Sequence, residues 1–120
     1  MYDHIGLKTK DLAASVRFYQ AALKALGQNL LSRDESGASF GSPGGQTLYL
    51  YPVKGMDNPG THVALRADDR AAVDRFYAAG LKSGGRDNGP PGLRADYSPT
   101  YYAAFLIDPD GNNVEAVCMT

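Results

Sequence analysis

The sequence predicts an α+β fold of two tandem βαβββ modules, forming a curved, mostly antiparallel sheet with the helices outside. Two observations support this. First, the chain repeats itself: residues 4–27 and 62–85 are identical at 12 of 24 aligned positions, at an offset of 58 residues. Second, in each half a helix-like segment follows a strand-like one, and two further strand-like runs are joined by a tight turn. Such a repeat indicates one supersecondary unit used twice.

Each half opens with a short strand and continues into a helix. The runs YDHIGLK and THVALR alternate with the period of a strand. We expect Asp11 to cap the first helix, and Asp68 or Asp69 to cap the second. Apolar residues at helical spacing then form one stripe per helix, and glycines follow where a helix favours a left-handed residue. The stripes are Leu12, Val16, Tyr19, Leu23 and Leu26, then Val73, Phe76, Tyr77 and Leu81; the glycines are Gly27 and Gly84-Gly85.

Each half closes with a hairpin, ASFG-SPGG-QTLYLYPV in the first and AAFLI-DPDG-NNVEAVCM in the second. Here the offset is 66, which pairs Pro43 with Pro109 and Gly45 with Gly111. Proline at the second position and glycine at the fourth, as in SPGG and DPDG, are typical of a tight turn. We therefore interpret DPDG as a turn only. Because the offset rises from 58 to 66, the second half has eight additional residues. We expect them in a surface loop within RDNGPPGLRADYSPT, residues 86–100.

Composition is that of one ordinary globular domain. The 120 residues predict a single domain over 1–120, with module one at about 1–57 and module two at about 58–120. A net charge of −1 provides no basic face for nucleic acid or an anionic membrane. The sequence contains no run of about 18 apolar residues, so we expect no transmembrane helix. The N-terminal MYDHIGL does not resemble a signal peptide. The single cysteine, Cys118, excludes an internal disulfide, so we expect a cytoplasmic location.

Strand alternation separates the apolar from the ligand-type residues. One set suits packing under the helices: Ile5, Leu7, Leu48, Leu50, Val63, Leu65, Val114, Ala116 and Cys118. The opposite set is His4, His62, Tyr49, Tyr51, Glu115 and Val117. If the sheets curve around this second set, two imidazoles and one carboxylate meet, which is the ligand set of non-haem iron and also suits Mn, Ni, Co or Zn. The alternative is a pair of structural histidines that duplication has preserved.

The order and spacing of these motifs resemble the vicinal oxygen chelate superfamily, which includes glyoxalase I, extradiol dioxygenases and the fosfomycin and bleomycin resistance proteins. The resemblance covers nearly the whole chain: DHIGL with RFYQAALKALG, THVAL with RFYAAG, and FLIDPDGNNVEAV. It implies one divalent metal ion per site, held by His4, His62 and Glu115, with Tyr49 in the remaining ligand position.

Tyr49 departs from the pattern of glyoxalase I, which normally has a glutamate there as ligand and proton-transfer base. A phenol with a reference pKa of about 10 does not replace that base near neutral pH, so the resemblance disfavours glyoxalase I activity. Extradiol dioxygenases usually have a further active-site histidine, and this chain has two histidines in all. Lyase, isomerase and dioxygenase chemistry therefore remain open.

Two functions follow as hypotheses. The first is a metal-dependent enzyme acting on a small oxygen-chelating substrate, in which Tyr49 hydrogen-bonds a metal-bound water or the substrate. Substrate contacts are then expected from Tyr51, Arg86, Arg94, Tyr97, Tyr101 and Tyr102. The second is a non-catalytic protein that sequesters a small molecule, as bleomycin resistance proteins do. The resemblance also implies a homodimer, with each site lying in one chain or shared between two.

Overall fold

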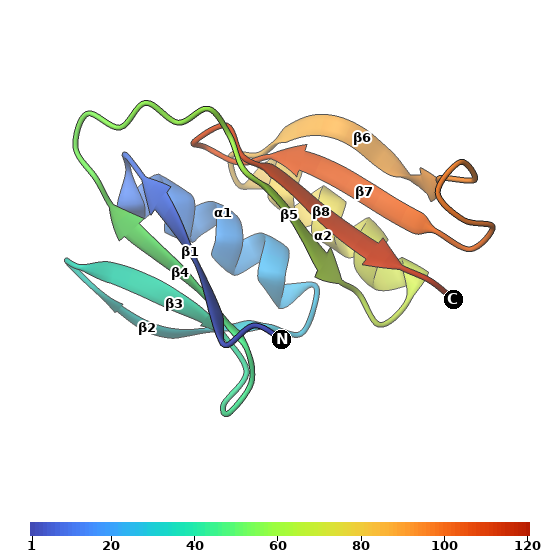
Figure 1. Ribbon diagram of the computed structural model, residues 1–120, viewed down its shortest axis with the longest axis horizontal. Helices are drawn as coiled ribbons and strands as arrows, with labels where there is room; N and C mark the ends of the chain where they lie inside the picture. The colour runs from blue at the N-terminus through green and yellow to red at the C-terminus, as the bar shows by residue number, and fades with distance from the viewer.

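In the computed structural model, which describes residues 1–120, the chain forms two four-stranded sheets with one helix behind each (Figure 1). The first module comprises β1 (His4–Thr9), α1 (Leu12–Lys24), β2 (Asn29–Asp34), β3 (Gly37–Gly41) and β4 (Thr47–Pro52). The second comprises β5 (His62–Arg66), α2 (Arg70–Lys82), β6 (Arg86–Leu93), β7 (Tyr102–Ile107) and β8 (Asn113–Cys118). The predicted α+β class and both βαβββ modules are confirmed. Neither helix is long and apolar enough to cross a membrane.

The strands form two separate sheets within one chain, in the orders β1-β4-β3-β2 and β5-β8-β7-β6. The first strand of each module pairs in parallel with the last, and the other pairings are antiparallel. Both helices lie on the same side of the molecule (Figure 1). The opposite sheet faces, which bear the histidines, therefore have no helix over them.

Aspartate side chains cap the N-terminal ends of both helices, and glycines follow their C-terminal ends, as predicted. Asp11 accepts a hydrogen bond from the Ala14 amide at 3.1 Å, and Asp69 accepts one from Ala72 at 2.8 Å. Gly27 and Gly84 have φ of +77° and +101°, in the region that favours glycine. The stripe of α1 is buried or half-buried, but at the end of the α2 stripe Leu81 is 39% exposed.

The two modules share one core, which α1 and α2 join at their contact. Gly80 of α2 allows the close approach, because a Cβ there would lie 2.3 Å from Leu106 Cδ1 and 3.2 Å from Phe18 Cε1. A polar contact crosses the same junction. Tyr19 on α1 donates to Asp108 in the turn between β7 and β8, and both side chains are buried. The DPDG segment, predicted as a turn only, is thus also a buried link between modules.

The segment 86–100, predicted as a surface loop, is partly a strand. Residues 86–93 form β6, which pairs with β7 at the edge of its sheet, with register shifts at Asp87/Gly89 and Gly89/Gly92. An edge strand tolerates Pro90 and Pro91, because prolines are accommodated on an open edge or at an irregularity, and both lie within the Gly89/Gly92 register shift. Only the residues after Leu93 form the loop to β7.

Candidate functional site

His62 and Glu115 lie side by side on the uncovered face of the second sheet. Strands β5 and β8 are paired so that Glu115 is opposite Ala64, two residues beyond His62 on the same face. The distance from His62 Nε2 to Glu115 Oε1 is 2.9 Å. Glu115 is only 2% exposed, whereas the imidazole is half exposed. A carboxylate buried to this degree needs polar partners, and His62 is one of two.

The second partner of Glu115 is the hydroxyl of Tyr101, which donates a hydrogen bond to Oε2. Burial of the phenol, followed by this hydrogen bond, raises the pKa of Tyr101 to about 12. Tyr101 therefore stays a protonated donor at neutral pH and orients the carboxylate with Oε1 toward His62. The ring of Tyr97 packs edge-on against that of Tyr101, with the centroids 5.0 Å apart.

Asn113 forms a hydrogen bond with the other ring nitrogen of His62, Nδ1. Its Nδ2 lies 2.7 Å from His62 Nδ1, while its own Oδ1 is buried and has no hydrogen-bond partner. A half-turn of the amide would bring Oδ1 to His62 Nδ1, which would then carry the imidazole proton. Nε2 would then have the free lone pair that a metal ion requires, whereas without metal Asn113 Nδ2 donates to Nδ1 and Nε2–H donates to Glu115 Oε1.

The His62–Glu115 pair suits a divalent metal ion. Two donor atoms each about 2.1 Å from one ion, at right angles, are about 3 Å apart, close to the 2.9 Å found between Nε2 and Oε1. Within one chain, however, no group of three His, Cys, Asp or Glu side chains is placed to hold a metal ion.

The third predicted ligand, His4, lies on β1 of the other sheet, where its ring is edge-on to Tyr49 at 5.5 Å. His4 Nδ1 lies 2.7 Å from the Asp3 carboxylate, which leaves Nε2 without a hydrogen-bond partner. Tyr49 is opposite Gly6 in the β1–β4 pair, as Glu115 is opposite Ala64 in β5–β8. In the repeat Tyr49 therefore occupies the place of Glu115, in agreement with the offset of 66.

Four of the predicted substrate residues lie away from Glu115 or contact it only indirectly. The ring of Tyr51 lies over Gly6 on β1, and Arg86 is exposed at the start of β6 with no side-chain hydrogen bond. Tyr102 faces α2, on the other side of the sheet, where its hydroxyl donates to Asp74 at 2.6 Å. Arg94 lies over the ring of Phe105, which is beside Glu115.

The sequence reasoning missed Asn113 and Phe105. Asn113 is two residues before Glu115 in one strand, so the alternation already applied to Glu115 places both on one face. Phe105 pairs with Glu115 across β7 and β8, and that register depends on the turn. The single thiol, Cys118, is buried on the helix side as predicted.

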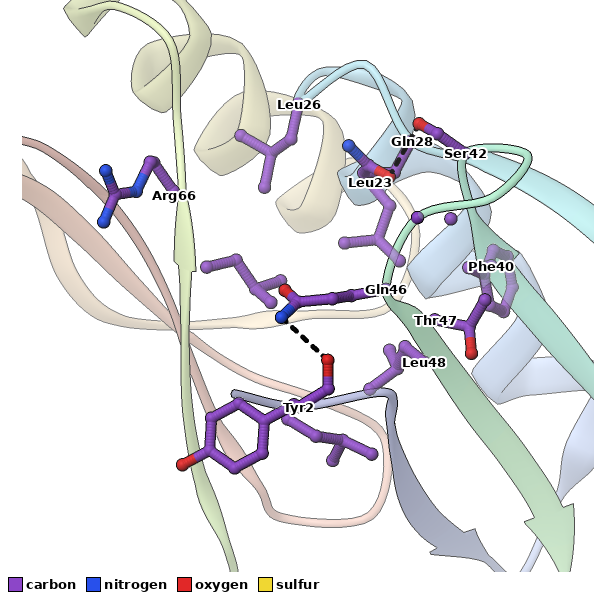
Figure 2. A pocket seen from close by; sticks show the side chains of 14 residues that line it. Tyr2, Leu23, Leu26, Gln28, Phe40, Ser42, Gln46, Thr47, Leu48 and Arg66 are labelled. Carbon is purple, nitrogen blue, oxygen red and sulfur yellow. Dashed lines mark hydrogen bonds between the residues drawn. The ribbon is translucent and has the colours of Figure 1, made fainter.

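A cavity of about 300 Å³ lies at the junction of the modules, apart from these residues. Figure 2 shows apolar side chains of the first module, among them Leu23, Leu26 and Leu48, gathered around it. Arg66 stands on the β5 side, and Gln46 donates to the carbonyl of Tyr2 (Figure 2). None of the predicted site residues lines this cavity. A second cavity, of about 270 Å³, is lined by Tyr51 and by residues of the connection between β4 and β5.

Comparison with known proteins gives one consistent family. The family model described as "Glyoxalase/Bleomycin resistance protein/Dioxygenase superfamily" matches residues 2–116. A search of functionally curated proteins finds no significant match.

Solved structures repeat the whole architecture. A glyoxalase/bleomycin resistance protein from Albidiferax ferrireducens is 29% identical, with a TM-score of 0.80 over 97% of this chain and 96% of that one. A glyoxalase/dioxygenase from Nostoc punctiforme is 24% identical, with a TM-score of 0.75 over 100% and 91%. A glyoxalase-related enzyme from Fulvimarina pelagi is 20% identical, with a TM-score of 0.74 over 98% and 86%. The last two are similar in fold alone.

Proposed function

Because the chain belongs to the glyoxalase/bleomycin resistance protein/dioxygenase superfamily, we propose that it is a divalent-metal-dependent enzyme acting on a small oxygen-chelating substrate. The reaction is a lyase, isomerase or dioxygenase reaction, and the metal is Fe, Mn, Ni, Co or Zn. The observation that supports this best is the 2.9 Å approach of His62 Nε2 to Glu115 Oε1 on an uncovered sheet face.

A homodimer completes the proposed site. One chain brings together only two of the three expected ligands, so His4 comes from a second copy. Its Nδ1 is held by Asp3 and its ring is largely exposed, so Nε2 is available to such a partner. In this arrangement the first sheet of one chain covers the second sheet of the other, and Tyr49 lies near the metal with His4. Two equivalent sites then form per dimer.

The residues of the chain position the ligands of the proposed site. Tyr101 fixes the Glu115 carboxylate by a hydrogen bond to Oε2, and Asn113 fixes the ring of His62. Phe105 provides an apolar wall beside both. When bound, the ion supplies Lewis acidity toward two neighbouring oxygens of the substrate. Tyr49 then donates a hydrogen bond to the substrate from the partner sheet.

Glyoxalase I activity is disfavoured within this proposal. The register that matches Tyr49 to Glu115 supports the inference that a tyrosine replaces the second carboxylate of that enzyme class. Without that carboxylate the site lacks the base for the proton transfer.

Metal analysis tests the proposal. Protein purified anaerobically without a histidine tag is compared with His62→Ala and Glu115→Gln, and with Glu35→Ala, an exposed carboxylate, as the matched control. We expect about one metal ion per chain in the wild type and the control, and little in the two site variants. Chelation should lower the melting temperature only of the proteins that hold metal. Absence of metal from the reconstituted wild type would refute the enzyme proposal.

A second candidate function is non-catalytic sequestration of a small molecule. It is favoured by the aromatic character of the first sheet's uncovered face, where Tyr49 and Tyr51 are 44% and 38% exposed. This function predicts ligand binding that chelation does not change, so the same melting curves separate the two candidates.

A further inference from the structure

Arg94 is a cation fixed against the backbone of the β6 strand. Its Nη1 donates to the carbonyl of Gly92 at 2.8 Å, and its Nη2 donates to that of Pro90 at 2.7 Å. The absence of side chains at Gly89 and Gly92 makes this possible, because a Cβ at either position would lie 3.2 Å from a guanidinium nitrogen. The guanidinium therefore has a defined position on the face that bears Glu115.

No carboxylate neutralises this charge. The two ion pairs of the chain are His4–Asp3 and His62–Glu115, and neither includes Arg94. The residue is half-buried, and its Cζ lies 5.3 Å from the centroid of the Phe105 ring. A guanidinium has five N–H donors, of which two are used here. The remaining donors, and the charge, are free for a ligand.

The position of Arg94 sets the shape of that ligand. Phe105 pairs with Glu115 across β7 and β8, and β6 is the next strand outward. Neighbouring strands are about 4.8 Å apart, so β6, where Arg94 is bound, lies roughly 10 Å from the strand of Glu115. The Phe105 ring lies between them. A ligand that reaches both ends has its anionic group about one aromatic ring away from its metal-facing oxygens.

We propose that the site takes a flat, ring-containing carboxylic acid, with the carboxylate held by Arg94, the ring along Phe105 and the oxygen substituents toward His62 and Glu115. This names the substrate class of the proposed site and rests on the proposed function for its location. Arginine suits a carboxylate because its planar fork matches both oxygens. The competing role is structural: Arg94 satisfies two carbonyls of an edge strand and nothing more.

The test uses 4-hydroxybenzoate and 4-hydroxybenzamide, which share shape but differ in charge, as probes with chelator-treated protein. Binding is followed by amide chemical shifts in NMR titrations. The wild type should bind the acid at least about tenfold more tightly than the amide, with shifts around Phe105. Arg94→Gln should abolish this preference and Arg94→Lys should reduce it. Arg33→Gln, on the equivalent edge strand β2, should retain it.

Equal affinity for the two probes, binding of neither, or a preference retained in Arg94→Gln would overturn the proposal. A structural role alone lowers the melting temperature of Arg94→Gln without changing the ratio of affinities, and Arg94→Lys keeps the charge if the glutamine variant folds poorly. Because no metal is present, failure of the metal-enzyme proposal leaves these outcomes unchanged, and metal analysis is in turn independent of them.

Discussion

The hydroxyl of Tyr19 donates a hydrogen bond of 2.5 Å to Asp108 Oδ2 and thereby joins α1 of the first module to a turn of the second. Asp108 also accepts from the amides of Asp110 and Asn112 and from the Asn112 side chain, so its buried carboxylate is fully hydrogen-bonded. The same turn receives the Lys10 amide on Asp110. The relative placement of the modules thus depends on buried polar contacts as well as on the shared apolar core.

Tyr19→Phe should lower the free energy of unfolding by about 1.5–3 kcal/mol, because it removes one of the two hydrogen bonds that Oδ2 of the buried Asp108 carboxylate accepts and leaves only that from Asn112. Urea denaturation of the variant measures this. Tyr77→Phe is the matched control, since it removes an exposed hydrogen bond to Asp87 and should cost less than about 1 kcal/mol. Equal losses in the two variants would show that the junction contact is not specially stabilising.

The phenol of Tyr101 should be among the last of the eight tyrosines to ionise, since its pKa is about 12 in the folded protein. A tyrosine whose pKa rises on folding stabilises the fold at pH values below its unfolded pKa, near 10, and this contribution is lost as the pH rises through about 12. The stability difference between wild type and Tyr101→Phe should therefore shrink between pH 10 and 12.

Absorbance titration at alkaline pH checks the assignment. Glu115→Gln removes the charged acceptor, so the pKa of Tyr101 should fall toward its ordinary value in that variant. A titration curve that is unchanged in Glu115→Gln would mean that Tyr101 does not interact with Glu115 in solution.

Most of the fold was predictable because the repeat fixed the element order and alternation fixed the strand faces. The helix caps followed from Asp11 and Asp69, whose side chains need only local backbone partners. The edge strand β6 was missed because Pro90 and Pro91 are typical of loops, and only the pairing with β7 makes the segment a strand. Leu81 was expected in the buried stripe, but α1 packs against the glycine beside it.

For the site, the sequence predicts only which face of a sheet each side chain occupies, because that follows from alternation within one strand. The faces of His62 and Glu115, and the equivalence of Tyr49 to Glu115, follow from strand parity and a constant offset. The separation of His4 from the other two ligands depends on how two sheets are placed, which no local pattern encodes. The contacts of Arg94 similarly depend on the irregular register of β6.

Asn113→Leu should weaken metal binding by about 10–100-fold, because the imidazole of His62 loses the partner that fixes its tautomer and orientation. Competition with a metal chelator measures the affinity. In the metal-free wild type, the nitrogen chemical shifts of His62 report the tautomer directly. Asn88→Leu, an exposed asparagine on β6, is the control and should retain wild-type affinity. Unchanged affinity in Asn113→Leu would exclude the positioning role.

The most direct test of the shared site mixes two variants, His4→Ala and His62→Ala, refolded together and compared with each variant alone against a chelator that the wild type withstands. If each site combines His4 of one chain with His62 and Glu115 of another, half of the randomly formed dimers are mixed and each mixed dimer has one intact site of two. We therefore expect the mixture to recover about a quarter of the wild-type metal per chain, while each variant alone holds almost none. Dimers that form in the mixture without recovering metal would contradict it.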